Sequence, residues 1–296
     1  MFNLKKDFML DPSVTFLNHG SFGATPKPVF KEYQRWQREL ENQPVEFLGR
    51  RHNDLMFASR TVLANYLGTR AENLVYVQNA TIGLNIVARS LDLKEGDEVL
   101  STNHEYGALD RTWRFLAKEK GFTYINQKVD LTSHDDFVKS FLAGVTANTK
   151  VIFLSHITSS TATMFPLEKI IQVAKSKNMI TVIDGAHAPG QINLNLDLLN
   201  PDFYAGNLHK WLCAPKGAGF LYANPKTQNL LKPLIVSWGY ESEAPSKSKF
   251  VDEHEWQGTR DIAAFLTVPQ AIAYQQEQDW GKVRSVCHQM AVDAWR

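Results

Sequence analysis

Short apolar runs alternate with longer helical patterns along most of this chain. Seven β-rich runs predict strands at Leu74–Gln78, Glu98–Ser101, Thr123–Asn126, Val151–Ser155, Ile180–Asp184, Phe203–Ala205 and Ala218–Tyr222. Helical patterns precede or separate them at Val29–Leu40, Ile82–Ser90, Ala108–Lys120, Phe137–Leu142 and Leu167–Ser176. Such alternation is typical of a mostly parallel sheet that is covered by helices on both faces.

The connection between the last two runs is shorter than the others. Lys210–Gly217 leaves no room for an ordinary crossover helix, so we expect the last strand to run antiparallel to its neighbour. The sequence therefore predicts a three-layer α/β/α fold with a mostly parallel, seven-stranded sheet in which one strand is reversed.

Two segments outside this pattern are predicted to be loops. Phe16–Pro28 is rich in Gly, Pro, Ser and Asn and leads into the first helix. Glu241–Lys249 is polar, contains Pro and Ser, and is predicted to be a mobile surface loop.

The chain closes with a largely helical stretch, Thr267–Arg296. Its apolar face is formed by Trp280, Val283, Cys287, Met290 and Ala294. Because this face continues to the end without a stop signal, we expect it to pack against a further C-terminal segment that is missing. We therefore divide the chain into an N-terminal loop segment (1–28), a large domain (29–266) and the start of a small C-terminal domain (267–296).

Composition and charge exclude several classes of protein. In 296 residues, 32 Lys and Arg balance 31 Asp and Glu, which predicts neither a nucleic-acid partner nor attraction to an anionic membrane. No apolar run approaches the roughly 20 residues that span a bilayer, and no apolar core of a signal peptide follows Met1–Asp11. Two cysteines are too few for a disulfide framework or a four-thiolate zinc site. We expect a cytoplasmic protein without a bound metal.

Polar clusters follow three of the predicted strands, at the edge where ligands bind in open α/β sheets. Asn79–Asn85 opens a helix with small residues, so its backbone N–H groups and the Thr81 hydroxyl can face an anion. An ordinary helix cap gives the same pattern. The cluster lacks the lysine of a P-loop and the glycine spacing of a dinucleotide fingerprint, so nucleotide binding is disfavoured.

Asp184 ends an otherwise apolar strand. A buried carboxylate there is costly without a cationic partner, and a protonated pyridine nitrogen would be such a partner. A capping Asp or a structural ion pair is the other interpretation. His187 follows three residues later. A lone histidine is more often structural, so His187 is a candidate ligand contact only because it lies close to Asp184 in the sequence.

Lys210 lies in the third cluster, Phe203–Trp211, among aromatic and small residues. Desolvation lowers the pKa of a lysine and frees its amine to form an imine with an aldehyde. Asn207 and His209 are candidates for further contacts to a phosphate or to the imine.

Six segments of the chain, arranged in the same order as in the family, resemble the fold-type I pyridoxal 5′-phosphate (PLP) enzymes of the class V aminotransferase family. The resemblance is greatest to the isopenicillin N epimerase-like proteins and extends over roughly Phe16 to Gln270. The segments that carry it are Phe16–Gly23, Asn79–Asn85, His104–Ala108, Asp184–His187, Asn207–Lys210 and Gln257–Asp261.

The resemblance implies PLP as the cofactor and a role for each matching residue. Lys210 would hold PLP as a Schiff base and then shuttle the α-proton of the substrate. Asp184 would pair with the pyridine nitrogen, and His187 would reach the phenolic oxygen. Tyr106 would lie over the pyridine face, with His104 as the alternative; a plain core aromatic is the other interpretation of Tyr106.

The phosphate and the substrate would be held by other matching residues. The phosphate contacts would be Ala80, Thr81, Asn207 and His209. Thr259 matches a phosphate contact from the neighbouring subunit, which implies a homodimer with shared active sites. Asn18 and His19 would lie near the substrate, and Arg260 would contribute in part to holding it.

The implied activity is a PLP-dependent reaction at the α-carbon of a small amino acid, as an epimerase or a lyase rather than a transaminase. A carbon–sulfur lyase or cysteine desulfurase-like activity is an alternative, although Cys213 and Cys287 do not match the segment that bears the nucleophilic cysteine of desulfurases. Another alternative is a catalytically impaired PLP-binding protein, because no residue matches the arginine that clamps the substrate carboxylate in the family.

Overall fold

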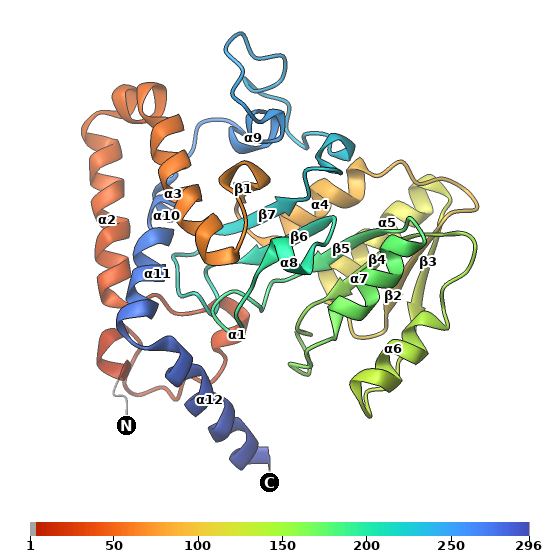
Figure 1. Ribbon diagram of the computed structural model, residues 1–296. Coiled ribbons are helices and arrows are strands. Elements are labelled where there is room, and N and C mark those ends of the chain that lie inside the picture. Colours follow the sequence, from red (N-terminus) through yellow and green to blue (C-terminus); the bar gives the residue numbers. More distant parts are fainter. Residues whose placement is uncertain (1–3, 296) are drawn as a thin grey trace.

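The computed structural model describes residues 4–295, so the ends of the predicted terminal segments, 1–3 and 296, lie outside it. Its seven strands are β1 (Leu74–Val77), β2 (Glu98–Thr102), β3 (Thr123–Gln127), β4 (Thr149–Ser155), β5 (Ile180–Asp184), β6 (Phe203–Asn207) and β7 (Gly219–Ala223). They form one sheet in the order β1-β7-β6-β5-β4-β2-β3 (Figure 1).

Strand direction agrees with the prediction. Neighbouring strands from β3 to β6 pair in parallel, whereas β7 is antiparallel to both β1 and β6. The α/β class, the seven strands and the single reversed strand are therefore confirmed. This order brings the carboxyl ends of β4, β5 and β6 together, since these strands are adjacent and parallel.

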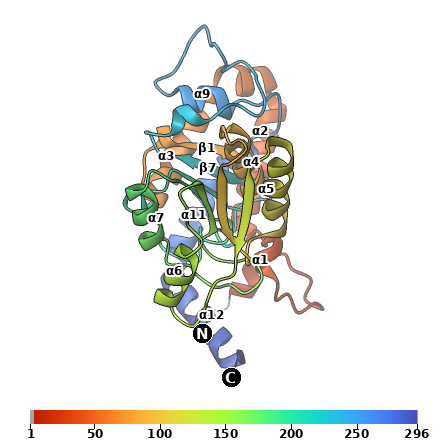
Figure 2. The same cartoon turned by 90° about the vertical axis from the view of Figure 1, so that its right-hand side faces the viewer.

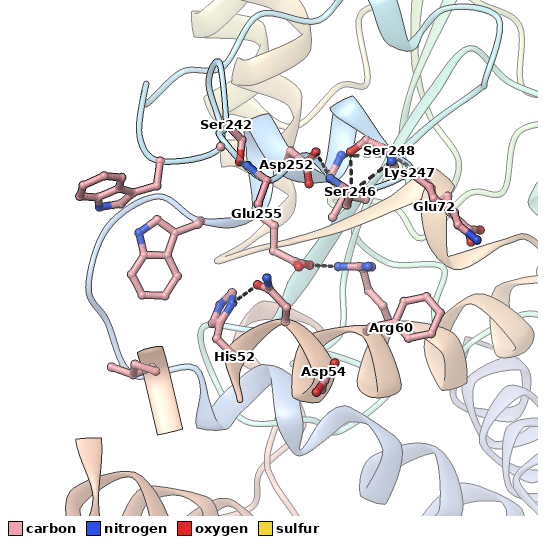
Figure 3. Close-up of a pocket in the computed structure, with 18 of the residues that line it drawn as sticks. His52, Asp54, Arg60, Glu72, Ser242, Ser246, Lys247, Ser248, Asp252 and Glu255 are labelled. Carbon is pink, nitrogen blue, oxygen red and sulfur yellow. Dashed lines mark hydrogen bonds and ion pairs between the residues drawn. The ribbon is translucent and has the colours of Figure 1, made fainter. Parts of the chain in front are cut away.

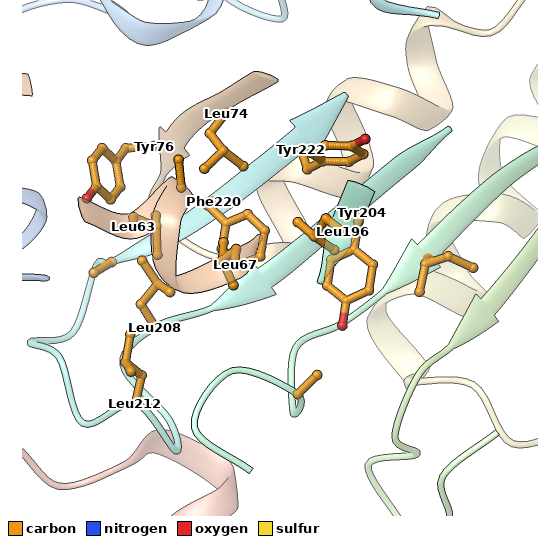
Figure 4. Packing of buried hydrophobic residues seen from close by; sticks show 14 of the residues in the cluster. Leu63, Leu67, Leu74, Tyr76, Leu196, Tyr204, Leu208, Leu212, Phe220 and Tyr222 are labelled. Atoms are coloured by element: carbon orange, nitrogen blue, oxygen red, sulfur yellow. The ribbon is translucent and has the colours of Figure 1, made fainter. Parts of the chain in front are cut away.

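Alternate residues of each strand enter two separate hydrophobic cores, one on each face of the sheet. Tyr204 and Phe220 belong to one core, which Figure 4 shows from close by. Ala205 and Leu221, the next residues along the same strands, belong to the other. Because both faces of the sheet are buried, apolar residues occupy consecutive strand positions and do not alternate with polar ones, as expected for a sheet covered on both sides.

Helices cover both faces (Figure 2). One face is covered by α4 (Ala80–Ser90), α5 (Gly107–Lys120) and α9 (Lys249–Glu255). The other is covered by α2 (Lys27–Asn42), α3 (His52–Leu67), α6 (His134–Leu142), α7 (Leu167–Ser176), α8 (Leu196–Leu199), α10 (Ala263–Leu266) and α11 (Val268–Glu277). Shorter helical segments lie between these elements or before them: η1 (Leu4–Asp7), α1 (His19–Phe22), η2 (Val45–Arg50), η3 (Ala71–Asn73) and η4 (Gln228–Leu230).

Helix α3 is an element for which the sequence analysis gave no prediction. Its buried face carries polar residues, His52, Ser59 and Arg60, among the apolar ones. These interrupt the apolar spacing on which helix prediction depends. In the structure they have partners: Ser59 Oγ donates to the carbonyl of Phe265, and Arg60 pairs with Glu255.

The predicted C-terminal helical stretch is divided into two helices. Asp279 has φ +49° and separates α11 from α12 (Trp280–Trp295). Helix α12 contains no buried residue, and Met290 on its predicted apolar face is 65% exposed. None of the helices in the part of the chain that the structure describes is long and apolar enough to cross a membrane.

Gly185, directly after β5, provides a test of the packing behind the sheet edge. A Cβ at this position would lie 1.9 Å from the ring of Tyr204, which is fully buried and hydrogen-bonded to His156. We expect Gly185→Ala to lower the free energy of unfolding by about 3 kcal/mol, because overpacking a filled core forces side chains or backbone to move.

Chemical denaturation measures this difference. Gly49→Ala is the matched control, since a Cβ there meets only a methyl group of Val45 at 4.0 Å. Its free energy of unfolding should change by less than about 1 kcal/mol. Equal stability of the Gly185→Ala variant and the parent would contradict the packing.

Candidate active site

The site lies where β4, β5 and β6 end side by side. Asp184 is the last residue of β5 and is 3% exposed. In the sheet register it pairs with Ser155, the last residue of β4, and with Ala205 of β6. Lys210 follows the end of β6 by three residues and is also buried. The strand order therefore brings a buried carboxylate and a buried amine, distant in sequence, to one edge.

Burial acts on both groups in opposite directions. It raises the pKa of Asp184 to about 6, although the Ala186 N–H, which donates to Oδ1 at 2.9 Å, and the charge of Lys210 oppose this shift. Burial also lowers the pKa of Lys210, and the charge of Asp184 opposes that shift. Each group thus experiences the field of the other, as expected of groups that face one small site.

His187 connects Lys210 to Trp211. The Lys210 Nζ lies 3.0 Å from His187 Nε2, and the indole N–H of Trp211 donates to His187 Nδ1 at 3.2 Å. Burial, followed by the neighbouring Lys210 charge, lowers the pKa of His187 to about 4. The imidazole is therefore neutral near pH 7.

The predicted phosphate loop is tied to the end of β6. The Asn207 amide oxygen accepts from the Ala80 N–H at 2.8 Å, and Asn79 caps α4 through the Ile82 N–H at 3.0 Å. The Ala80 N–H is therefore engaged within the protein, whereas Thr81, at the same helix start, is partly exposed.

His209, another predicted phosphate contact, is held by backbone. Its Nδ1 lies 3.0 Å from the carbonyl oxygen of Ala218, which leaves Nε2 as the ring nitrogen for a ligand. Burial lowers the pKa of His209, and the charges of Lys210 and Lys216 act in the same direction.

The N-terminal loop packs directly on the lysine loop. His19 Nε2 lies 3.0 Å from the carbonyl oxygen of Lys210. Gly23 has φ +70°, and a Cβ there would lie 1.9 Å from the carbonyl oxygen of His209, so this contact requires glycine. Asn18 is exposed and caps α1 by accepting from the Ser21 N–H at 3.2 Å.

Glu105 is a further carboxylate near Asp184, and it was not among the site residues predicted from the sequence. Its Oε1 accepts from the Thr102 hydroxyl at 2.7 Å, and its Oε2 accepts from the Ser155 N–H at 2.8 Å and hydroxyl at 2.6 Å. Burial raises the pKa of Glu105 to about 7, and the charge of Asp184 adds to this rise. Its neighbour Tyr106, the predicted ring partner, is 45% exposed at the start of α5.

Thr259 and Arg260 lie in different surroundings from Lys210. Thr259 is exposed. The Arg260 guanidinium lies 4.7 Å over the ring of Phe265, and two of its nitrogens are buried without a hydrogen-bond partner. Burial lowers the pKa of Arg260, and the charge of Glu255 opposes this shift. The structure of one chain therefore gives Arg260 no contact with the groups around Asp184.

A separate cavity of about 700 Å³ lies between the start of α3 and the segment 238–256 (Figure 3). The buried Arg60–Glu255 ion pair forms part of its wall, with His52 and Asp54 nearby. None of the predicted site residues lines this cavity. Its volume is therefore not that of the predicted PLP site.

The structure brings together Lys210, Asp184 and His187, and it adds three residues to which the sequence analysis gave no role. Ser155 carried a usable signal, because it is a polar residue at a strand's carboxyl end, like Asp184. Glu105 lies inside a segment used for the family resemblance, and Trp211 directly follows another, but sequence patterns do not tell where their side chains point.

Comparisons with known proteins agree with the resemblance. The family described as aminotransferase class-V matches residues 16–294. The chain is 37% identical to an isopenicillin N epimerase of Amycolatopsis lactamdurans, over 98% of this chain and 76% of that protein. It is 29% identical to a hercynylcysteine sulfoxide lyase of Schizosaccharomyces pombe, over 98% of this chain and 75% of that protein.

A solved structure shares the fold. It is described as a C-DES mutant with glycine covalently linked to the PLP cofactor, and it superposes with a TM-score of 0.81. The superposition covers 93% of this chain and 74% of that chain, with 24% sequence identity. The expected fold class is therefore confirmed from structure as well as from sequence.

Asp184→Asn tests the cost of burying this carboxylate. An unfolded Asp ionises near pH 3.8, whereas the folded pKa is about 6. Between these values the folded state binds more protons, so the parent loses stability as pH rises from 4 to 6. Asparagine cannot ionise, and we expect the variant to gain, relative to the parent, on the order of 2 kcal/mol across this range.

Denaturation of the cofactor-free protein at several pH values measures the gain. Asp54→Asn, at an exposed position, is the control and should follow the parent at each pH. A difference between Asp184→Asn and the parent that stays constant from pH 4 to pH 7 would contradict the assigned environment.

Proposed function

Because the chain belongs to the class V aminotransferase family, we propose that it is a PLP-dependent enzyme that acts at the α-carbon of a small amino acid through Lys210. The observation that carries the proposal is the buried Lys210–Asp184 pair at the carboxyl edge of the sheet, with His187 in contact with the amine.

The donor set fits PLP. Lys210 offers a primary amine whose pKa burial lowers, as reaction with an aldehyde requires. Asp184 offers a carboxylate in a dry place, where it needs the cationic partner that a protonated pyridine nitrogen provides. We assign the phosphate to Thr81 and to Nε2 of His209; the place of Thr81 in the first turn of α4 and the engagement of the other His209 ring nitrogen support this assignment.

Each of these residues has a defined task in the proposed reaction. When bound, PLP supplies an aldehyde that condenses with amines and a ring that withdraws electrons from the α-carbon. Asp184 maintains that electron withdrawal by holding the ring nitrogen protonated. Lys210 Nζ takes the α-proton from the substrate and returns it. His187, with its neutral ring, donates from Nε2 within this site.

The reaction outcome is open between two types. Removal of the α-proton by Lys210 and delivery of a proton from solvent to the opposite face gives epimerisation, whereas loss of a β-substituent gives a lyase. We place epimerase activity first because the relatives at 37% and 33% identity are isopenicillin N epimerases. The lyase alternative is supported by relatives such as the sulfoxide lyase and an L-cysteine desulfhydrase-like protein of Epichloe uncinata.

Desulfurase chemistry through a thiol of this chain has less support. Burial raises the pKa of Cys213 to about 12, so its thiol stays protonated. Cys287 is exposed on α12.

We also propose that the enzyme is a homodimer, in which Thr259 contributes to the partner's site; the exposure of Thr259 permits this.

Lys210→Ala tests the site of attachment. We expect borohydride treatment of the PLP-loaded parent to fix the cofactor on the peptide that contains Lys210, as seen by mass spectrometry. Lys210→Ala should lose this adduct and at least about 100-fold in the rate of α-proton exchange, as for other positioned general bases. Lys216→Ala is the control, since Lys216 is exposed in the same loop and should leave both measurements unchanged. An adduct on another lysine would remove Lys210 from this role.

The substrate reaction is tested in deuterated water with a panel of L-amino acids that includes cysteine. We expect deuterium at the α-carbon of at least one amino acid, because Lys210 Nζ exchanges its proton with solvent. A D-amino acid product identifies an epimerase, whereas pyruvate or a sulfur product identifies a lyase. Cofactor attachment at Lys210 without exchange for any amino acid would instead support a catalytically impaired PLP-binding protein.

A further inference from the structure

Trp211 donates one hydrogen bond into the proposed site. Its indole N–H is a donor only, so His187 Nδ1, which lies 3.2 Å away, must carry a lone pair. A neutral imidazole with an unprotonated Nδ1 has its proton on Nε2. That proton points at Lys210 Nζ, 3.0 Å from His187 Nε2, and an amine accepts a hydrogen bond only when it is unprotonated.

We propose that the indole N–H of Trp211 fixes the protonation state of His187, keeping its proton on Nε2, and thereby holds the Lys210 amine in its unprotonated form. Trp211 is then a positioning residue, which acts on Lys210 through His187. This role deepens the proposed function, on which it rests, because the unprotonated amine is the form that attacks an aldehyde.

The protein holds the indole in place from several sides. A Cβ at Gly20 would lie 2.9 Å from the Trp211 ring, and a Cβ at Gly190 would lie 2.3 Å from its backbone. Gln275 Nε2 donates to the Trp211 carbonyl oxygen at 2.7 Å. The ring of His19 lies 5.3 Å from the indole, centroid to centroid. The N–H of Trp211 is therefore aimed by packing and does not depend on His187 for its direction.

The same arrangement disfavours a charged His187. Imidazolium also carries a proton on Nδ1, so it would bring a second donor against the Trp211 N–H. The lowered pKa of His187 has this sign, with burial as its main cause. The other titratable groups around these residues include Asp184 and His209, whose charges interact with Lys210, and His19, which packs on Trp211. The Cys213 thiol also contacts the Trp211 carbonyl oxygen, at 3.7 Å.

Trp211→Phe removes the N–H and retains an aromatic ring. In the full chain, freed of aldehyde with hydroxylamine, we expect the His187 titration midpoint, followed by NMR, to rise from about 4 by about one pH unit. One unit is a tenfold gain in proton affinity, the size expected from one lost neutral hydrogen bond. The ¹⁵N resonance of His187 Nδ1 should also shift downfield, toward the position of a ring nitrogen without a hydrogen bond.

Two further variants keep the experiment decisive. Benzothienylalanine at position 211 has the shape of tryptophan without its N–H, so it should reproduce the NMR changes even if phenylalanine disturbs the fold. Trp280→Phe is the matched control, because Trp280 donates to the Gly190 carbonyl oxygen at 3.0 Å and not to His187. It should leave both His187 signals unchanged.

An unchanged His187 midpoint and Nδ1 resonance in the benzothienylalanine protein would overturn the proposal. Because these signals are measured without cofactor, they are independent of the Lys210 adduct. A missing adduct with a responsive His187 would count against the proposed function alone, and an intact adduct with an unresponsive His187 would count against the role of Trp211 alone.

Discussion

The burial of an amine and a carboxylate at one edge of the sheet is the constraint on which the site depends. Water would stabilise both charges, and its exclusion raises the pKa of Asp184 and lowers that of Lys210. Neither residue gains stability from this placement, since burying a charge costs free energy unless a partner compensates. The arrangement suits the proposed ligand, whose aldehyde would react with the Lys210 amine and whose basic ring nitrogen would pair with the Asp184 carboxylate.

The strands and loops around this pair hold it by hydrogen bonds of fixed direction. Glu105 accepts from both Thr102 and Ser155, and so ties the ends of β2 and β4 to the loop that carries Tyr106. On the other side, the Trp211 N–H orients His187 toward Lys210. Because the indole N–H of Trp211 and the backbone N–H of Ser155 can only donate, these two bonds define the orientation of His187 and Glu105.

Relatives of this chain are described with several different activities. Proteins that match this chain are described as isopenicillin N epimerases, a hercynylcysteine sulfoxide lyase and L-cysteine desulfhydrase-like proteins. In this chain, Tyr106 and the loop that carries His19 are exposed or partly exposed and belong to connections rather than strands. Connections vary at little cost to the core, which is how one fold supports several reactions.

The sheet and its reversed strand could be predicted from the sequence, because strand periodicity and the length of a connection are local signals. Asp184 and Lys210 could be picked out as candidates, because a polar residue after an apolar run is also a local signal. Which distant groups meet became known from the three-dimensional structure. It directed the Ala80 N–H to Asn207 and placed Arg260 over Phe265. It also formed α3 around buried polar side chains that find partners elsewhere in the chain. Strand order and loop paths fix such contacts, and neither leaves a periodic trace in the sequence.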